Sequence, residues 1–282
     1  MMVHICNILL VGMILNLLQL NSSYAFNLYA NVWQTTNSNF QPAFVSDDSI
    51  PPNNYVLTGK DIYFKAGHKK AHAYLLKAGK KTNKYVFVFH EWWGLNNYIK
   101  HEAQHLQADL GNVNVLVIDL YDGHIATTAD SALAYMRLAT DKRCRQIIDG
   151  AIKYAGKRAE IATLGWGLGG SWSLHAAIMC GVQAKACVMY YGMPESNAVK
   201  LKNICPVLGI FGNDDTRITP KIVDRFQTIM QQVNQTLVVY RYDAKADFAN
   251  PYNTNHHVEA TNQAYNQTIS FIKKMLLQMP AH

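Results

Sequence analysis

The chain has 282 residues, of which 49% are hydrophobic and 16% are charged. This composition is typical of a globular protein with a sizeable core, and it excludes an intrinsically disordered chain. The formal net charge is +7, but the Lys and Arg residues are scattered and form no basic block. We therefore expect no nucleic-acid partner.

The N-terminal segment has the pattern of an export signal. Residues 8–20 are strongly apolar, and Ser23-Tyr24-Ala25 follows as a small-x-Ala cleavage site. The apolar run is short for a membrane span. We expect cleavage after Ala25 and a periplasmic or secreted protein. An uncleaved anchor is the alternative, because no Lys or Arg precedes the apolar run, and only that alternative implies a membrane contact.

Residues 26–58 are rich in Asn, Gln, Ser and Pro, which indicates a loosely ordered segment before a single domain at 59–282. In this domain, short apolar runs alternate with stretches of helical period, which predicts an α/β fold with a mainly parallel, twisted sheet and helices on both faces. The expected strands are 61–64, 71–76, 85–89, 113–118, 161–165, 186–191, 207–211 and 237–242, and the expected helices lie near 97–110, 129–139, 142–156, 168–180, 219–232 and 257–277. The first two strands are expected to form a hairpin, because a polar turn that contains Gly joins them.

Functional residues in such sheets gather at the carboxyl ends of the strands. The segments at these ends resemble the dienelactone hydrolase family, a branch of the α/β-hydrolases. The resemblance extends over residues 60–277 and keeps the motifs in order along the chain. The matching segments are HEWWGLN at 90–96, DLYDG at 119–123, GWGLGG at 165–170, YYGMP at 190–194, GIFGNDDTRITP at 209–220 and YDAKADFANP at 242–251. The resemblance implies an α/β-hydrolase fold and a hydrolase of esters or lactones.

The family's site is a Cys-His-Asp triad with a glutamate that holds the thiol proton. By position, the resemblance places the glutamate at Glu91 and the acid at Asp215, and both are present. The cysteine position is Gly167 and the histidine position is Ala246. The two residues that make and break bonds in the family are therefore substituted in this chain.

These substitutions bear directly on the chemistry. Glycine has no atom that can attack a carbonyl, and alanine cannot move a proton. The sequence therefore predicts a hydrolase-class protein whose covalent mechanism is impaired or lost. The resemblance places two oxyanion-hole donors at the amides of Trp92 and Leu168, and these survive because they belong to the backbone. We expect a small ester, lactone or carboxylate as ligand, bound by a monomer.

Three alternatives stay open. Glu91 could serve as general base for a water molecule, or His256-His257 could fold back as a relocated base beside a relocated nucleophile. The protein could also be a non-catalytic binder of a ligand or partner in the cell envelope. A purely structural role would explain two of the residues. His90 would be a hydrogen-bonded histidine at a strand end, and Asp215 would cap the turn that follows it.

Four cysteines follow the export signal. Cys144, Cys180, Cys187 and Cys205 could pair after export or remain buried thiols, and both outcomes are consistent with their apolar surroundings. Their spacing does not resemble a metal site, so we expect neither a metal nor a cofactor.

Overall fold

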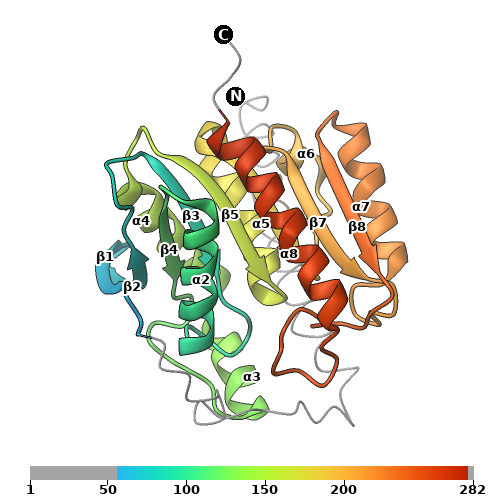
Figure 1. The fold of residues 1–282 in the computed structure, drawn as a ribbon, viewed down its shortest axis with the longest axis horizontal. Coiled ribbons are helices and arrows are strands. Elements are labelled where there is room, and N and C mark those ends of the chain that lie inside the picture. Colours follow the sequence, from blue (N-terminus) through green and yellow to red (C-terminus); the bar gives the residue numbers. More distant parts are fainter. Residues whose placement is uncertain (1–55, 279–282) are drawn as a thin grey trace, which may run out of the picture. The chain divides into compact units, whose positions relative to one another are not determined.

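An eight-stranded sheet forms the centre of the described part of the protein, which comprises residues 56–278 of the computed structural model (Figure 1). These residues belong to one of two compact units of the chain, residues 41–282. The expected export signal, which includes Cys6, and almost all of the expected lead-in lie outside the described residues.

The sheet is mainly parallel, as the sequence predicts. The strand order is β1-β2-β4-β3-β5-β6-β7-β8. The hairpin strands β1 and β2 pair antiparallel, β2 pairs antiparallel with β4, and all further pairs are parallel. The strands are β1 Lys60–Ala66, β2 Lys69–Leu76, β3 Lys84–Phe89, β4 Asn114–Ile118, β5 Glu160–Trp166, β6 Ala184–Tyr190, β7 Val207–Gly212 and β8 Leu237–Tyr242.

Helices cover both faces of this sheet, as Figure 1 shows, with α2 and α8 on one face and α4 and α5 on the other. The helices are α2 Asn97–Leu110, α3 Ala129–Leu138, α4 Asp141–Ala155, α5 Leu168–Cys180, α6 Ala198–Leu201, α7 Pro220–Gln232 and α8 Val258–Ile272, which a π-helical turn extends over Lys273–Leu277. Because both faces are covered, the central strands are buried throughout: every residue of β4 and β7 is buried.

The predicted elements are confirmed, and α2 and β8 have the predicted bounds. Helix α2 begins where it does because Asn96 caps it, with its side chain accepting from the amide of Ile99 at 3.1 Å. The sequence did not predict α6, which has only four residues and therefore leaves almost no periodic signal.

The four cysteines of the described residues are free, buried thiols. The structure therefore favours the second of the two outcomes left open by the sequence. Burial raises their pKa values, to about 11 for Cys187 and about 12 for Cys180, so these thiols are unreactive at neutral pH. Within residues 56–278, no helix combines the length and the hydrophobicity that a membrane crossing requires.

Candidate active site

Gly167 lies in the sharp turn between β5 and α5. Its backbone has φ 55° and ψ −116°, and its amide donates to the carbonyl oxygen of Tyr190 at 2.9 Å. Residues with a side chain adopt this combination of angles only under strain. The turn that would present a nucleophile in the family is therefore formed here, with a glycine at its tip.

Neighbouring glycines bring α5 close to the sheet. A Cβ atom at Gly165 would collide with the carbonyl group of Gly169, and one at Gly169 would collide with the carbonyl oxygen of Phe89. Only glycine fits where two backbones approach this closely. The glycines of GWGLGG thus hold the first turn of α5 against the carboxyl ends of β3 and β5.

The two amides expected to form the oxyanion hole follow adjacent strands. Leu168 is the first residue of α5, so its amide has no acceptor within the helix. Trp92 follows β3, and β3 and β5 are paired so that Phe89 lies opposite Gly165. The Trp92 side chain is buried against Trp93, with ring centroids 4.7 Å apart. This arrangement is compatible with two converging backbone donors beside a helix N-terminus, which favours negative charge.

Glu91 is buried just beyond β3, with 7% of its surface exposed. Its Oε2 accepts from Asn250 Nδ2 at 2.7 Å, and the hydroxyl of Tyr191 donates to Oε1 at 3.4 Å. Both of these partners are side chains. Burial, reinforced by the nearby charge of Asp247, raises the pKa of Glu91 to about 8. A carboxyl with such a pKa can either hold or accept a proton near neutral pH.

Asp215 lies beyond β7, and its two carboxylate oxygens differ in their hydrogen bonding. Its Oδ1 accepts from the amides of Arg217 at 2.7 Å and Ile218 at 2.9 Å, which confirms the expected cap on the following turn. Its Oδ2 is buried and has no hydrogen-bond partner among the described residues. Burial raises the pKa of this carboxyl above its usual value. An acceptor without a donor is what remains if the imidazole of a triad is removed.

The segment that would carry the histidine carries a carboxylate instead. Ala246 is followed by Asp247, whose φ of 61° is unusual for a residue with a side chain. Arg217 Nη2 pairs with Asp247 Oδ1 at 2.8 Å. Burial raises the pKa of both Glu91 and Asp215, and the nearby charge of Arg217 offsets part of that rise. The site thus contains three carboxyl groups around one guanidinium group.

The turn at Gly167 between β5 and α5 is called the elbow below. Two serines near the elbow make hydrogen bonds to other parts of the fold. The Oγ of Ser171 accepts from the amide of Met193 at 2.8 Å, and the Oγ of Ser173 donates to the carbonyl oxygen of Val188 at 2.8 Å. Both side chains are buried. Neither serine is therefore placed as a substitute for the missing thiol.

The nearby histidines also have structural contacts. His90 is fully buried, with Nε2 accepting from the amide of Leu120 at 3.0 Å and Nδ1 donating to the carbonyl oxygen of Glu91 at 2.6 Å. This confirms the satisfied strand-end histidine. His257 caps α8, because its Nδ1 accepts from the amide of Ala260 at 3.2 Å. These contacts fix both rings in structural roles.

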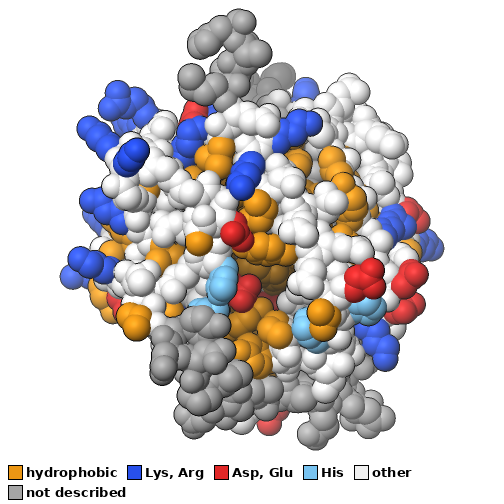
Figure 2. Space-filling model, in the orientation of Figure 1, with side chains coloured by type: hydrophobic (Ala, Val, Ile, Leu, Met, Phe, Trp, Pro, Cys, Tyr) orange, Lys and Arg blue, Asp and Glu red, His pale blue; other side chains and the backbone are white. Residues whose placement is uncertain are grey.

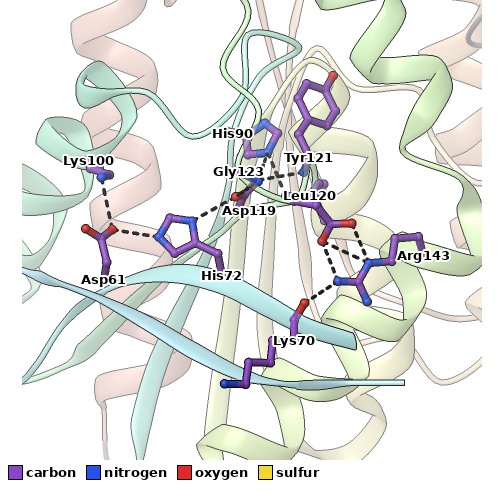
Figure 3. Close-up of polar contacts among 11 residues, drawn as sticks. Asp61, Lys70, His72, His90, Lys100, Asp119, Leu120, Tyr121, Gly123 and Arg143 are labelled. Atoms are coloured by element: carbon purple, nitrogen blue, oxygen red, sulfur yellow. Dashed lines mark hydrogen bonds and ion pairs between the residues drawn. The ribbon is translucent and has the colours of Figure 1, made fainter. Parts of the chain in front are cut away.

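A second polar cluster lies at the carboxyl end of β4 (Figure 3). Asp119 Oδ1 accepts from the amide of Tyr121 at 2.8 Å, and Oδ2 accepts from the amide of Gly123 at 2.6 Å and from His72 Nδ1 at 3.0 Å. His72 Nε2 in turn reaches Asp61 Oδ1 at 2.9 Å. The chain of contacts ties the β1–β2 hairpin to β4. Every oxygen of Asp119 therefore has a partner.

A model of the dienelactone hydrolase family matches residues 71–276, and the chain belongs to this family. A protein of Aquifex aeolicus (strain VF5), provisionally named a carboxymethylenebutenolidase, is 24% identical over 183 residues, which are 61% of this chain and 78% of that protein. This membership agrees with the motifs at the strand ends.

Solved structures of similar fold include a dienelactone-hydrolase-like promiscuous phosphotriesterase from metagenomic libraries, with a TM-score of 0.68 and 20% identity over 78% of this chain and 98% of that one. The dienelactone hydrolase from Anabaena variabilis ATCC 29413 has a TM-score of 0.56 and 17% identity over 78% and 98% of the two chains. These likenesses show the α/β-hydrolase fold.

The sequence did not single out four residues of the site: Tyr191, Arg217, Asp247 and Asn250. All four lie inside matched motifs, and an acid directly after the substituted Ala246 is a signal that could have been noticed. The sequence could not show that Arg217 pairs with Asp247, because the two residues are 30 positions apart and only the fold brings them together.

Proposed function

We propose that this protein is an exported, monomeric member of the dienelactone hydrolase family that has lost covalent catalysis and binds a small ester, lactone or carboxylate at its elbow. One atom supports this proposal above all. Asp215 Oδ2 is a buried acceptor with no donor among the described residues, and the position that would supply a donor holds Ala246. Desolvating an acceptor without a hydrogen bond costs about 1–3 kcal/mol, so the site carries a cost that a triad would not.

The binding part of the proposal rests on the backbone. Leu168 begins α5 and Trp92 follows the adjacent strand, so two amides can meet a carbonyl or carboxylate oxygen without any catalytic side chain. Such a hole alone gives roughly 10³- to 10⁴-fold acceleration over water. For a stable ester, whose uncatalysed hydrolysis is very slow, this residual rate is still too low for efficient turnover, so the pocket would act mainly as a binding site.

The decisive experiment restores both reactive groups. Residues 26–282 are assayed with p-nitrophenyl acetate as the parent protein, as Gly167→Cys, as Ala246→His and as the double variant. We expect equally low residual rates in the parent and in both single variants. The double variant should gain at least about 100-fold, because a positioned general base and nucleophile act as a unit. A parent that already turns over, or a folded double variant that stays silent, contradicts the proposal.

Ligand binding and export are measured separately. γ-Butyrolactone serves as the lactone probe and acetate as the carboxylate probe, and a saturable rise in Tm of the parent is expected for at least one of them. The comparison variant is Leu168→Pro, which removes one of the two proposed amide donors at a helix position that tolerates proline. Because the buried Leu168 side chain is lost as well, the Tm of this variant without ligand serves as its own reference. Expression of the full chain in a Gram-negative host, with N-terminal sequencing of the product, tests cleavage after Ala25.

A specific observation favours one alternative, hydrolysis by water with Glu91 as general base. The pKa of Glu91, raised to about 8 by burial, lies close to the working range of a base. In that case the parent hydrolyses p-nitrophenyl acetate with a rate that rises with pH through this pKa, and Glu91→Gln abolishes the rate. Turnover that survives Glu91→Gln would exclude Glu91 as the base.

A further inference from the structure

Two histidines on α2, outside the elbow, are spaced as metal ligands. Residues 101–105 read His-Glu-Ala-Gln-His and lie inside α2. Residues four apart share one face of a helix, and His-Glu-x-x-His on a helix is a pattern in which both imidazoles bind one metal ion. The sequence-based expectation of no metal rests on the cysteines and does not consider this pair.

The two imidazoles are already at the separation that a metal ion requires. His101 Nε2 and His105 Nε2 lie 3.2 Å apart, with ring centroids 4.3 Å apart and the ring planes inclined at 66°. A metal–nitrogen bond to histidine is about 2.0–2.1 Å, so two such bonds span that separation at an angle of about 100°, between the octahedral and tetrahedral values. The two nitrogens are hydrogen-bonded to each other in the structure, and an ion would take the place of the shared proton without a change of helix geometry.

The helix that carries the pair is well anchored. Asn96 caps its N-terminus, and Ile99, Ala103, Leu106 and Leu110 are buried against the sheet. His105 is exposed and His101 is partly exposed. Figure 2 shows histidine side chains at the surface beside acidic ones, in the region that α2 occupies in Figure 1. The donors are therefore held on a rigid element and can be reached from solvent.

We propose that His101 and His105 bind one divalent transition-metal ion of the zinc, nickel or copper class through their Nε2 atoms. Within residues 56–278, no group of three or more His, Cys, Asp or Glu side chains is placed to hold a metal ion, so the two imidazoles are the proposed protein ligands. Imidazole ligands select these ions over Mg²⁺ and Ca²⁺, which prefer oxygen. The site lies on a different element from Gly167 and does not depend on the proposed function.

The test is a calorimetric titration of the full chain, purified without a polyhistidine tag, with CuCl₂, NiCl₂, ZnCl₂ and MgCl₂ at pH 7.5. We expect one ion per chain, affinity highest for Cu²⁺, and no binding of Mg²⁺. His101→Gln and His105→Gln should each lower affinity by at least about tenfold, since even outer-sphere partners of a metal ligand contribute 10- to 100-fold. His68→Gln, at an exposed turn histidine, is the matched control and should bind as the parent does.

A second readout connects the metal to the folded helix. Because the pair is preorganised only in α2, saturating Ni²⁺ should raise the Tm of the parent and of His68→Gln but not of His101→Gln or His105→Gln. A parent that binds none of these ions, or histidine variants that bind with the parent's affinity, would overturn the proposal. Either result leaves the elbow hypothesis unaffected, because neither variant touches the elbow.

Discussion

Two aspartates that follow strands of the same sheet have pKa values shifted in opposite directions. Asp119, beyond β4, accepts from two amides and from His72, and these hydrogen bonds outweigh burial and lower its pKa. Asp215, beyond β7, accepts from two amides through Oδ1 only, and burial raises its pKa. Both side chains are buried, so burial alone does not decide which form of the carboxyl is favoured. The presence of an imidazole donor distinguishes the two.

A histidine has a different role in each of the two sites. In the cluster around Asp119, the histidine joins the hairpin to the sheet, and its loss would cost stability. In the elbow, the position that the resemblance assigns to the family's histidine holds Ala246, and Asp215 Oδ2 has no hydrogen-bond partner among the described residues. A structural histidine is thus kept by the fold, whereas a catalytic one is kept only by function.

The largest expected effect comes from removing each aspartate in turn. Asp119→Ala leaves His72 and two amides without their acceptor and should lower the free energy of unfolding by about 3 kcal/mol. Asp215→Ala loses two amide contacts but also removes the unsatisfied oxygen, so about 1 kcal/mol is expected. Urea denaturation at pH 7 measures both, with the exposed Asp214→Ala as control. Equal losses at the two sites would show that the different hydrogen bonding of Asp119 and Asp215 does not affect stability.

The pH dependence separates the two clusters further, beginning with His72. Hydrogen bonding to Asp119, and then to Asp61, raises the pKa of His72 in the folded protein. Its contribution is therefore fully present below the unfolded pKa of about 6.5 and is lost as pH rises through the raised folded pKa. His72→Gln should lower stability by about 1 kcal/mol at pH 6 and by less at pH 9. An equal loss at both pH values would contradict the assignment.

Glu91 changes stability in the same direction with pH, but as a cost that appears rather than as a contribution that is lost. Its folded pKa of about 8 lies above the ordinary 4.5, so between these values the folded protein holds a proton that the unfolded chain has released. Stability therefore falls as pH rises over this interval. Glu91→Gln should change little at pH 5 and should stabilise the protein at pH 9 by on the order of 1 kcal/mol or more. Thermal unfolding at the two pH values measures this, and a destabilised variant at pH 9 would rule out the raised pKa.

The sequence predicts most of the fold because its signals are local. The bounds of α2 follow from a capping Asn96 and an apolar period, and the buried strands follow from continuous apolar runs such as YVFVF at 85–89. The elbow is equally local, since four glycines in six residues leave few other conformations. These features need no knowledge of distant partners.

The polar contacts could not be predicted in this way. His72 meets Asp119 across 47 residues, and Asn250 meets Glu91 across 159. The chain has many acids and amides, and only the strand order determines which of them come together. The metal-ligand spacing of His101 and His105 is local, however, and a search for His pairs four apart would have found it.

The smallest expected effect concerns the elbow glycine itself, and α5 offers a control for it at its other end. Gly167 before the helix has φ 55° and ψ −116°, and Gly181 after it has φ 53° and ψ −126°. A side chain is strained in this region whatever its surroundings, so Gly167→Cys and Gly181→Cys should each lose about 1 kcal/mol, or roughly 2–4 °C in Tm. A Gly167→Cys protein that melts above the parent would contradict the strain argument at the elbow. If only Gly181→Cys melts lower, contacts around position 167 offset the strain, and the vacant nucleophile position still accommodates a thiol. If both melt lower, glycine at the elbow avoids a strain that a residue with a side chain would impose. The folded protein is then more stable with glycine at position 167 than with a nucleophile there.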